Sequence, residues 1–228
     1  MRLDKYLADM SVGTRSEVKA IIRNKRIKVN DEIITKADYK LKDDDRVYLD
    51  DIEIIYEEYE YYLLNKPAGY LSATEDRYDP VVMDLIESKR KDLSPVGRLD
   101  KDTEGLLLIT NDGLLNHQLL SPKSHVSKKY YVVTDKPLPE NSKEMLESPM
   151  DLGDFITKPG IYEKIDDKSS YLTIYEGKYH QVKRMYEKLG LTVTYLQRVE
   201  FAFLKLDNLK IGEYRRLSEE EIDKLKSL

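Results

Sequence analysis

The sequence predicts an α+β fold in two parts, a small N-terminal module and a larger domain. Three observations lead to this prediction. Two short helical patterns followed by short strand-like runs fill most of the first sixty residues. The acidic stretch 57–60 then interrupts the pattern as a polar linker, and beyond it apolar runs of strand length alternate with helical stretches. A chain of 228 residues suits one large or two unequal domains, and we place them at residues 1–58 and 60–228.

The N-terminal module is predicted to be an ααβ unit. Apolar residues fall on one side of a first helix within residues 3–10, and a capping box at Thr14–Glu17 opens a second helix. Short strands are expected around residues 27–33 and 47–49. The apolar side chains on which these elements depend are Leu3, Leu7, Met10, Val18, Ile21, Ile22, Ile27, Val29, Ile33, Leu41, Val47 and Leu49.

Charge is distributed unevenly along the chain. The net charge is −5, but residues 1–30 carry eight lysines and arginines against three acids, a net +5, whereas residues 31–60 carry four against twelve, a net −8. Arg15, Lys19 and Arg23 are spaced by four and line the outer face of the second helix. A basic face backed by an acidic remainder would attract and orient a polyanion.

The larger domain is predicted to begin with a strand at residues 61–66, which runs into a turn at Pro67–Gly69. A helix is expected at residues 81–89, and a short buried strand at residues 106–110. The remaining predicted elements are strands at residues 126–133 and 172–176 and a helix from residue 181 that Gly190 terminates.

Asp100 is a candidate functional residue because it lies between an arginine-bearing turn and the apolar strand, where we expect the end of a sheet. An arbitrary aspartate near a glycine is more often a loop cap. The full string GRLDKDTEGL, residues 97–106, closely resembles the catalytic segment G-R-L-D-x-D-T-x-G-L of the pseudouridine synthases of the RsuA type. The resemblance implies that Asp100 is the nucleophile. The string LLNKPAGY, residues 63–70, is similar to the start of the catalytic domain in that family.

Two further segments resemble the same family. Lys128-Lys129-Tyr130 fits its K-x-Y pattern, which implies that Tyr130 is the active-site tyrosine, while Tyr131 faces the opposite side of the strand. The string EGKYHQVKRM, residues 176–185, fits E-G-[RK]-x-H-Q-V-[RK]-R-M, in which the basic residue after the valine pairs with the nucleophile. That position is Lys183, and Arg184 is the alternative partner.

Residues 1–50 resemble the small RNA-binding module named after ribosomal protein S4. The likeness rests on GTRSEVKAIIRNKRIKVND, residues 13–31, although Asn24-Lys25 stands where that family usually has a glycine. Arg98, beside the nucleophile, either contacts RNA or forms a salt bridge with Glu104 or Asp102. The expected RNA-binding residues are Arg2, Arg15, Lys19, Arg23, Arg26, Arg98, Lys178, His180 and Arg184.

The resemblance implies a catalytic domain built on a mixed, largely antiparallel β-sheet flanked by helices, and the isomerisation of uridine to pseudouridine in RNA. This reaction includes no redox or phosphoryl step, so we expect no cofactor and no metal. The residues agree, because the chain has no cysteine and its three histidines lack the spacing of metal ligands. A cation next to Asp100 would keep the carboxylate ionised in a pocket that excludes water.

The segment EGKYHQVKRM looks more like the small-subunit branch of the family than the large-subunit branch. We therefore expect 16S rRNA as the partner and substrate, as free RNA or in an assembling subunit, and a monomeric enzyme. No apolar run approaches the roughly 20 residues that a membrane span needs, and the absence of cysteine fits a reducing, cytoplasmic location.

Three alternatives are weighed against this reading. The first is a large-subunit rRNA pseudouridine synthase. The second is a non-catalytic RNA-binding ribosome-assembly factor that kept the fold, against which the intact Asp100, Tyr130 and Lys183 count. The third is a retaining glycosidase that uses Asp100 and Glu104 as a carboxylate pair, and it would explain neither the basic module nor Tyr130.

Overall fold

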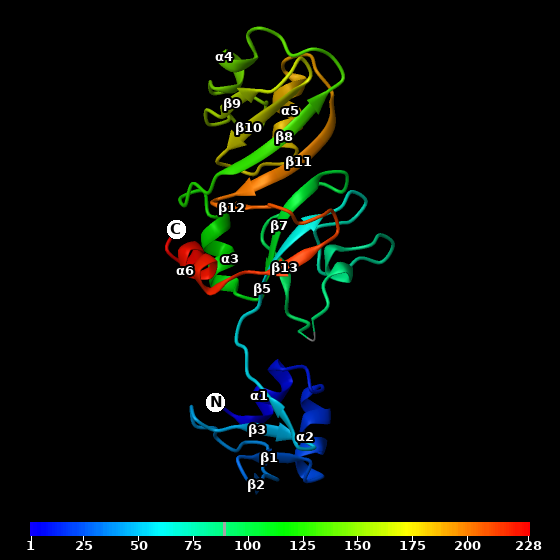
Figure 1. Ribbon diagram of the computed structural model, residues 1–228, viewed down its shortest axis with the longest axis vertical. Helices are drawn as coiled ribbons and strands as arrows, with labels where there is room; N and C mark the ends of the chain where they lie inside the picture. The colour runs from blue at the N-terminus through cyan, green and yellow to red at the C-terminus, as the bar shows by residue number, and fades with distance from the viewer. Residues whose placement is uncertain (89) are drawn as a thin grey trace. The chain divides into compact units, whose positions relative to one another are not determined.

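The structure is a computed structural model that describes residues 1–88 and 90–228. The chain forms two compact units, Met1–Tyr59 with Glu87–Asp92 and Glu60–Ile86 with Leu93–Leu228 (Figure 1). Within these described residues, no helix has the length and apolar character that a membrane crossing requires.

In the N-terminal unit two helices share one apolar core with a four-stranded antiparallel sheet of order β2-β1-β3-β4. The expected capping box is present, because the Thr14 hydroxyl accepts from the Glu17 N–H and the Glu17 carboxylate accepts from the Thr14 N–H at 2.7 Å. The elements are α1 (Leu3–Asp9), α2 (Arg15–Arg23), β1 (Ile27–Val29), β2 (Glu32–Ile33), β3 (Val47–Leu49) and β4 (Ile52–Ile54).

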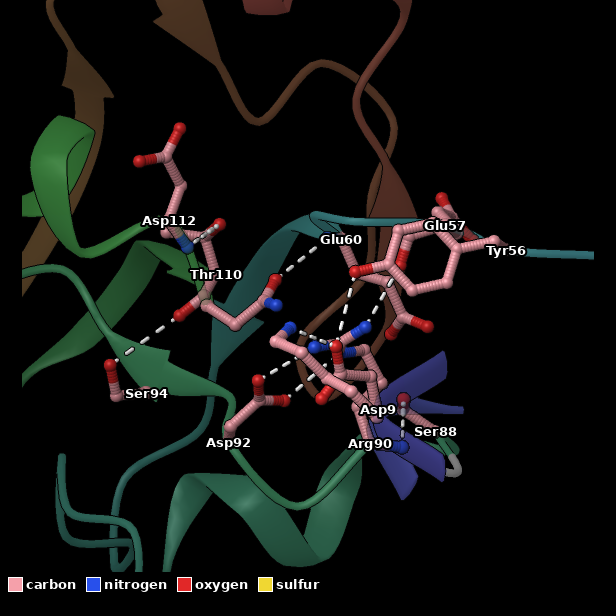
Figure 2. Close-up of polar contacts among 12 residues, drawn as sticks. Asp9, Tyr56, Glu57, Glu60, Ser88, Arg90, Asp92, Ser94, Thr110 and Asp112 are labelled. Carbon is pink, nitrogen blue, oxygen red and sulfur yellow. Dashed lines mark hydrogen bonds and ion pairs between the residues drawn. The ribbon is translucent and has the colours of Figure 1, made fainter. Parts of the chain in front are cut away.

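Residues 87–92 fold with the N-terminal unit although their neighbours in sequence belong to the larger one. Arg90 is buried and anchors this segment. Its Nη1 donates to the Glu57 carbonyl at 2.8 Å, and its Nε and Nη2 donate to the two carboxylate oxygens of Asp92 at 2.9 and 2.7 Å (Figure 2). A segment that follows the linker by about thirty residues is thus tied back to the linker's own backbone.

The larger unit is built on a mixed sheet of order β13-β5-β7-β11-β8-β10-β9, with β12 paired to β11 and β6 to β7. Of the strand pairs in the described residues, only β7 with β11 is parallel, so the predicted mixed, largely antiparallel sheet is confirmed. The strands are β5 (Tyr61–Lys66), β6 (Ser94–Pro95), β7 (Glu104–Thr110), β8 (Lys128–Thr134), β9 (Ile161–Lys164), β10 (Ser169–Ile174), β11 (Val193–Phe201), β12 (Leu204–Lys205) and β13 (Tyr214–Arg216).

Helices flank this sheet. The Asp112 side chain accepts from the Leu115 N–H at 3.0 Å and so caps α3 (Gly113–Leu120). The inward face of α5 (Gln181–Glu187) buries Val182, Met185 and Tyr186. After α5, Gly190 adopts a φ of +75°, a left-handed conformation that glycine tolerates at a helix end. The other helices are α4 (Ser142–Leu146) and α6 (Glu219–Lys226).

One predicted helix is wrong. Residues 81–89 form only a short 3₁₀ helix, η1 (Val82–Leu85), and Lys89 lies outside the described residues. Val81 is engaged in a bridge with Leu71 before the helix begins, and Ile86 is extended after it. From residue 87 the chain belongs to the other unit, so a helix over residues 81–89 would have to continue from one unit into the other.

Candidate active site

The loop of Asp100, residues 97–103, is held in place by hydrogen bonds to its backbone atoms. Gly97 enters it with a φ of +72°. The Leu99 N–H donates to the Ser72 hydroxyl at 3.0 Å, and that hydroxyl donates back to the Leu99 carbonyl at 2.9 Å. The Thr103 N–H closes a turn on the Asp100 carbonyl at 3.0 Å. The backbone contacts leave the Asp100 carboxylate available for other partners.

Lys66, the last residue of β5, supports the same loop from inside the protein. It is fully buried, and its ammonium lies within 2.8–3.3 Å of four backbone carbonyls, those of Pro67, Asp100, Lys101 and Thr103. Burial lowers the pKa of Lys66 to about 8, although nearby carboxylates act in the other direction. Three of its four acceptors belong to the Asp100 loop, so this lysine positions the carboxylate without touching it.

Lys183 of α5 reaches the Asp100 carboxylate. Its ammonium lies 3.1 Å from Asp100 Oδ2 and 2.7 Å from Asp102 Oδ1, and the side chain of Asp100 is 28% exposed. Burial by itself would lower the pKa of Lys183, but the hydrogen bonds and charges of Asp102 and Asp100 outweigh it and raise the pKa above its usual value. The same ammonium lowers the pKa of Asp102. Lys183 is thus a charged lysine shared by two carboxylates.

Arg184, the alternative partner, points elsewhere. Its guanidinium pairs with the Asp154 carboxylate and donates to the Leu152 carbonyl at 2.6 Å. His180, which precedes α5 with a φ of +48°, places Nε2 at 3.5 Å from Asp100 Oδ1. Tyr179 stacks on the His180 ring, with centroids 3.9 Å apart. Of the two basic residues at the start of α5, the structure therefore brings Lys183 and not Arg184 to Asp100.

A pocket of about 90 Å³ opens beside Asp100. Tyr130 of β8 forms part of its wall and is 7% exposed, while Tyr131 lies on the other face of the sheet against Tyr171 and Tyr195. Among the expected site residues, those that line the pocket are Arg98, Asp100, Tyr130, Lys178, His180 and Lys183. No ion pair of Arg98 is found within the described part of the chain, so the alternative of a salt bridge to Glu104 or Asp102 is not formed here.

Two buried cations in the pocket wall, Lys128 and Arg198, are absent from the expected site residues. A signal for Lys128 exists in the sequence, because alternation along β8 puts it on the same face as Tyr130. Arg198 lies in β11, and no motif in the sequence marks it. Its place depends on Gly105, where a Cβ atom would collide with the Arg198 backbone.

The expected RNA-binding residues of the N-terminal unit differ in their surroundings. Arg15, Lys19 and Arg23 are exposed along α2, and no ion pair of theirs occurs among residues 1–88 and 90–228. Arg2 pairs with Asp4, and Arg26 pairs with Asp50. No group of His, Cys, Asp or Glu side chains suited to a metal ion occurs in the described residues.

Comparisons with known proteins agree with this geometry. Residues 60–188 match the family model described as RNA pseudouridylate synthase, and residues 1–47 match the S4 domain. The chain is 43% identical to an uncharacterised RNA pseudouridine synthase, YtzG, of Bacillus subtilis, with 97% of each chain covered. It is 39% identical to the ribosomal small subunit pseudouridine synthase A of Haemophilus influenzae, with 99% of each covered, and 38% identical to that of Escherichia coli, with 97% and 98% covered.

A solved structure described as a pseudouridylate synthase superposes with a TM-score of 0.70 at 37% identity, and 99% of each chain is covered. The comparisons therefore confirm both resemblances on which the sequence analysis depends, including an S4 module that binds RNA. The chain belongs to the RsuA family of RNA pseudouridine synthases, and it is an isomerase that carries an S4 domain at residues 1–47.

Proposed function

We propose that this enzyme converts a uridine of small-subunit rRNA to pseudouridine, with Asp100 as the nucleophile, Lys183 as its ionic partner and Tyr130 against the base. The observation that carries the proposal is the 3.1 Å contact between the Lys183 ammonium and the Asp100 carboxylate at a pocket that Tyr130 lines. A carboxylate that must attack while partly removed from water needs a nearby cation to stay ionised.

Each of these three side chains has a part in the proposed reaction. The N1–C1′ bond of uridine breaks, the uracil turns within the pocket, and a C5–C1′ bond forms. Asp100 attacks either the ribose C1′ or the uracil ring. Tyr130 offers a flat face on which the base can stack and a hydroxyl that can relay the proton lost from C5 in the last step.

The target uridine must leave the RNA stack to enter the pocket, at a cost of a few kcal/mol unless it is already unpaired. Arg98, Lys178 and His180 line the pocket, and we assign them to RNA contacts that hold the flipped nucleotide. Arg184 can join them only by exchanging its Asp154 partner for a phosphate. On the S4 domain, Arg15, Lys19 and Arg23 are assigned to phosphate contacts that position the enzyme without reading sequence.

Two observations favour small-subunit rRNA over large-subunit rRNA. Relatives at 39% and 38% identity over nearly the whole chain bear the name ribosomal small subunit pseudouridine synthase A. The segment EGKYHQVKRM, which carries His180 and Lys183, resembles the small-subunit branch of the family.

The test is to incubate the protein with transcribed small-subunit and large-subunit rRNA, and with partly assembled small subunits, and to map pseudouridine in each. We expect modification at one position of the small-subunit RNA and none in the large-subunit RNA. RNA incubated without enzyme sets the background, and Asp100→Asn is assayed in parallel. Modification confined to large-subunit rRNA would contradict the substrate, and activity in Asp100→Asn would contradict the assignment of the nucleophile.

A further inference from the structure

Two buried cations of the pocket wall, Lys128 and Arg198, form what we call the floor of the pocket, and no carboxylate of the described residues contacts them. Lys128 is 7% exposed and Arg198 is 2% exposed. The Lys128 ammonium donates to the Val126 carbonyl at 2.7 Å, and Arg198 Nε donates to the Leu106 carbonyl at 2.7 Å. Arg198 Nη2 is buried without a hydrogen-bond partner among the described residues. A buried donor of this kind costs free energy until a ligand accepts from it.

A β-bulge places one aromatic ring beside both cations. In the pairing of β11 with β8, Arg198 lies opposite Tyr130 and Phe201 lies opposite Lys128, with a register shift between Arg198 and Glu200. Regular alternation would place residues 198 and 200 on one face; the bulge places 198 and 201 there instead. The Phe201 ring then lies 5.2 Å from the Arg198 guanidinium and 5.6 Å from the Lys128 ammonium.

The surrounding charges do not neutralise this floor. Burial, and then the charge of Arg198, lower the pKa of Lys128 to about 8, while Glu176 opposes them. The Glu176 carboxylate is engaged by the Gln181 amide at 3.0 Å and by the Lys158 N–H. At the mouth, Lys183 is already matched by Asp100 and its neighbour. The floor therefore keeps a net positive charge at neutral pH.

The enclosed space suits a single ring. Its volume of about 90 Å³ is of the same order as the roughly 150 Å³ cavity that holds one benzene molecule. Apolar side chains of Ile174, Val182 and Leu196 complete the lining. A phosphate of the RNA backbone would instead meet the cations at the rim, which are exposed.

We propose that Lys128 and Arg198 bind the oxygens of the uracil ring and stabilise the negative charge that the ring acquires when it is detached from the ribose. This inference rests on the proposed active site. When the N1–C1′ bond breaks, its electron pair remains on the uracil and spreads over N1, O2 and O4, while C1′ is taken by the Asp100 carboxylate. In the second half C5 supplies an electron pair to C1′, the carboxylate leaves, the C5 proton is lost and N1 gains one. If Asp100 attacks the ring instead, the charge again falls on a ring oxygen.

Fixed cations aimed at a developing charge in a dry site are among the most effective catalytic devices. The same contacts would also keep the detached base from escaping while it turns. The specificity for uracil follows as well, because Arg198 Nη2, a donor without an acceptor among the described residues, favours a ring that presents carbonyl oxygens and disfavours the amino group of cytosine.

The experiment compares Lys128→Met and Arg198→Lys with Lys129→Met as the matched control. Lys129 is the next residue of β8 but lies on the other face, where it pairs with Glu163. Single-turnover rates at saturating RNA are measured on substrates with uridine or 5-fluorouridine at the target position, by chromatography of digested RNA. Fluorine withdraws electrons and stabilises the ring anion, so it reduces the need for protein cations.

On uridine we expect Lys128→Met to lower the single-turnover rate by about 10²-fold, with RNA affinity changed less than about threefold. On the fluorinated substrate, the rate at which Lys128→Met consumes the N1-linked 5-fluorouridine should be less than about tenfold below the wild-type rate. Lys129→Met should match the wild type on both. An equal reduction on both substrates overturns the proposal, and so does weaker RNA binding with an unchanged saturating rate, which would indicate a phosphate contact.

A second arm covers the case in which Lys128→Met does not fold. Burial and the charge of Arg198 lower the pKa of Lys128 to about 8, so we expect the wild-type pH–rate profile to have an alkaline limb near pH 8. Lys128→Arg keeps a cation that stays protonated, so this limb should move to higher pH. An alkaline limb that does not move overturns the proposal. A wild type that forms no pseudouridine in any rRNA would contradict the proposed function instead, so the two failures are distinguishable.

Discussion

The mouth and the floor of the pocket each contain a partly or fully buried lysine, and the two lysines meet opposite conditions. At the mouth, Lys183 is buried in part but contacts Asp100 and a second carboxylate, which raise its pKa. At the floor, no carboxylate in the described part of the chain contacts Lys128, and burial and the charge of Arg198 lower the pKa of this lysine to about 8. The partner and not the burial alone decides the state of a lysine here. The charge of Lys183 at the mouth is neutralised by carboxylates of the protein. The positive charge at the floor is instead complementary to the negative charge that the uracil ring would acquire.

The largest effect should come from removing the carboxylate at the mouth. Asp100→Asn keeps the shape of the side chain but removes the nucleophile, so we expect turnover to fall by about 10⁴-fold or more while the RNA dissociation constant changes less than about threefold. Asp102→Asn is the matched control, because it takes a carboxylate from the same ammonium without removing the nucleophile, and its rate should fall by less than about tenfold. Pseudouridine above background from Asp100→Asn would contradict the mechanism.

The next effect concerns the cation at the mouth. Lys183→Met should lower the rate by about 10² to 10³-fold, because the attacking carboxylate would lose the cation that holds it in place at the pocket. Lys183→Arg should retain much of the activity, since charge matters more than shape in a simple ion pair. A wild-type single-turnover rate in Lys183→Met would contradict the pairing of Lys183 with the nucleophile.

Lys66 is a third lysine for this comparison, and all its hydrogen-bond acceptors among the described residues are backbone carbonyls. Lys66→Met should destabilise the protein by about 2–4 kcal/mol at pH 7 in urea unfolding, because carbonyls of the Asp100 loop would be left without their donor. Lys101→Met, which removes only an exposed ion pair with Asp79 on the same loop, should cost less than about 1 kcal/mol.

The difference in unfolding free energy between the wild type and Lys66→Met should depend on pH with a definite sign. The folded-state pKa of Lys66 is lowered to about 8, so between pH 8 and 10 the unfolded chain binds more protons than the folded one, and wild-type stability gains with rising pH. Lys66→Met lacks this gain, and the gap between the two proteins should widen by on the order of 1–2 kcal/mol from pH 8 to 10. A gap that narrows with rising pH would mean that the charged form of Lys66 is favoured in the folded state.

The smallest effect on catalysis should come from the exposed cations of α2. Replacing Arg15, Lys19 and Arg23 with Ala should weaken RNA binding and reduce the slope of log K against log salt by roughly 0.7 to 0.9 for each phosphate that is no longer neutralised, with the saturating rate and the modified position unchanged. The matched control replaces Lys36, Lys40 and Lys42, which are also exposed but lie in the acidic half of the unit. Equal slopes for the two triple variants would contradict a specific role of the α2 face.

Much of the fold could be predicted because several elements are marked by short-range sequence patterns. The capping box at Thr14–Glu17, the apolar run that becomes β7 and the alternation that becomes β8 are short-range patterns with one sensible structure. The pairing of Lys183 with Asp100 could be named from motifs alone, although 83 positions separate the two residues.

What could not be predicted depends on contacts distant in sequence. The burial of Lys66 follows from carbonyls more than thirty residues away, and nothing in a lysine next to a proline signals it. Arg198 faces the pocket because β11 pairs with β8 and β7, which are distant in sequence, and the bulge that follows Arg198 shifts the alternation on which a prediction from sequence relies. The helix predicted up to residue 89 fails where the segment around Arg90 begins, because the association of this segment with the N-terminal unit is a tertiary preference that local propensity does not contain.

The contact between Gly105 and the backbone of Arg198 has a kinetic consequence. It lies in the parallel pair of β7 and β11, whose partners are 93 residues apart in the chain. Closing so long a loop costs conformational entropy, which slows the pairing of β7 with β11. During synthesis β7 also leaves the ribosome well before β11. The centre of the sheet and the floor of the pocket should therefore form in one late step, and a folding intermediate should be able to hold RNA through its S4 domain before it can modify a single uridine.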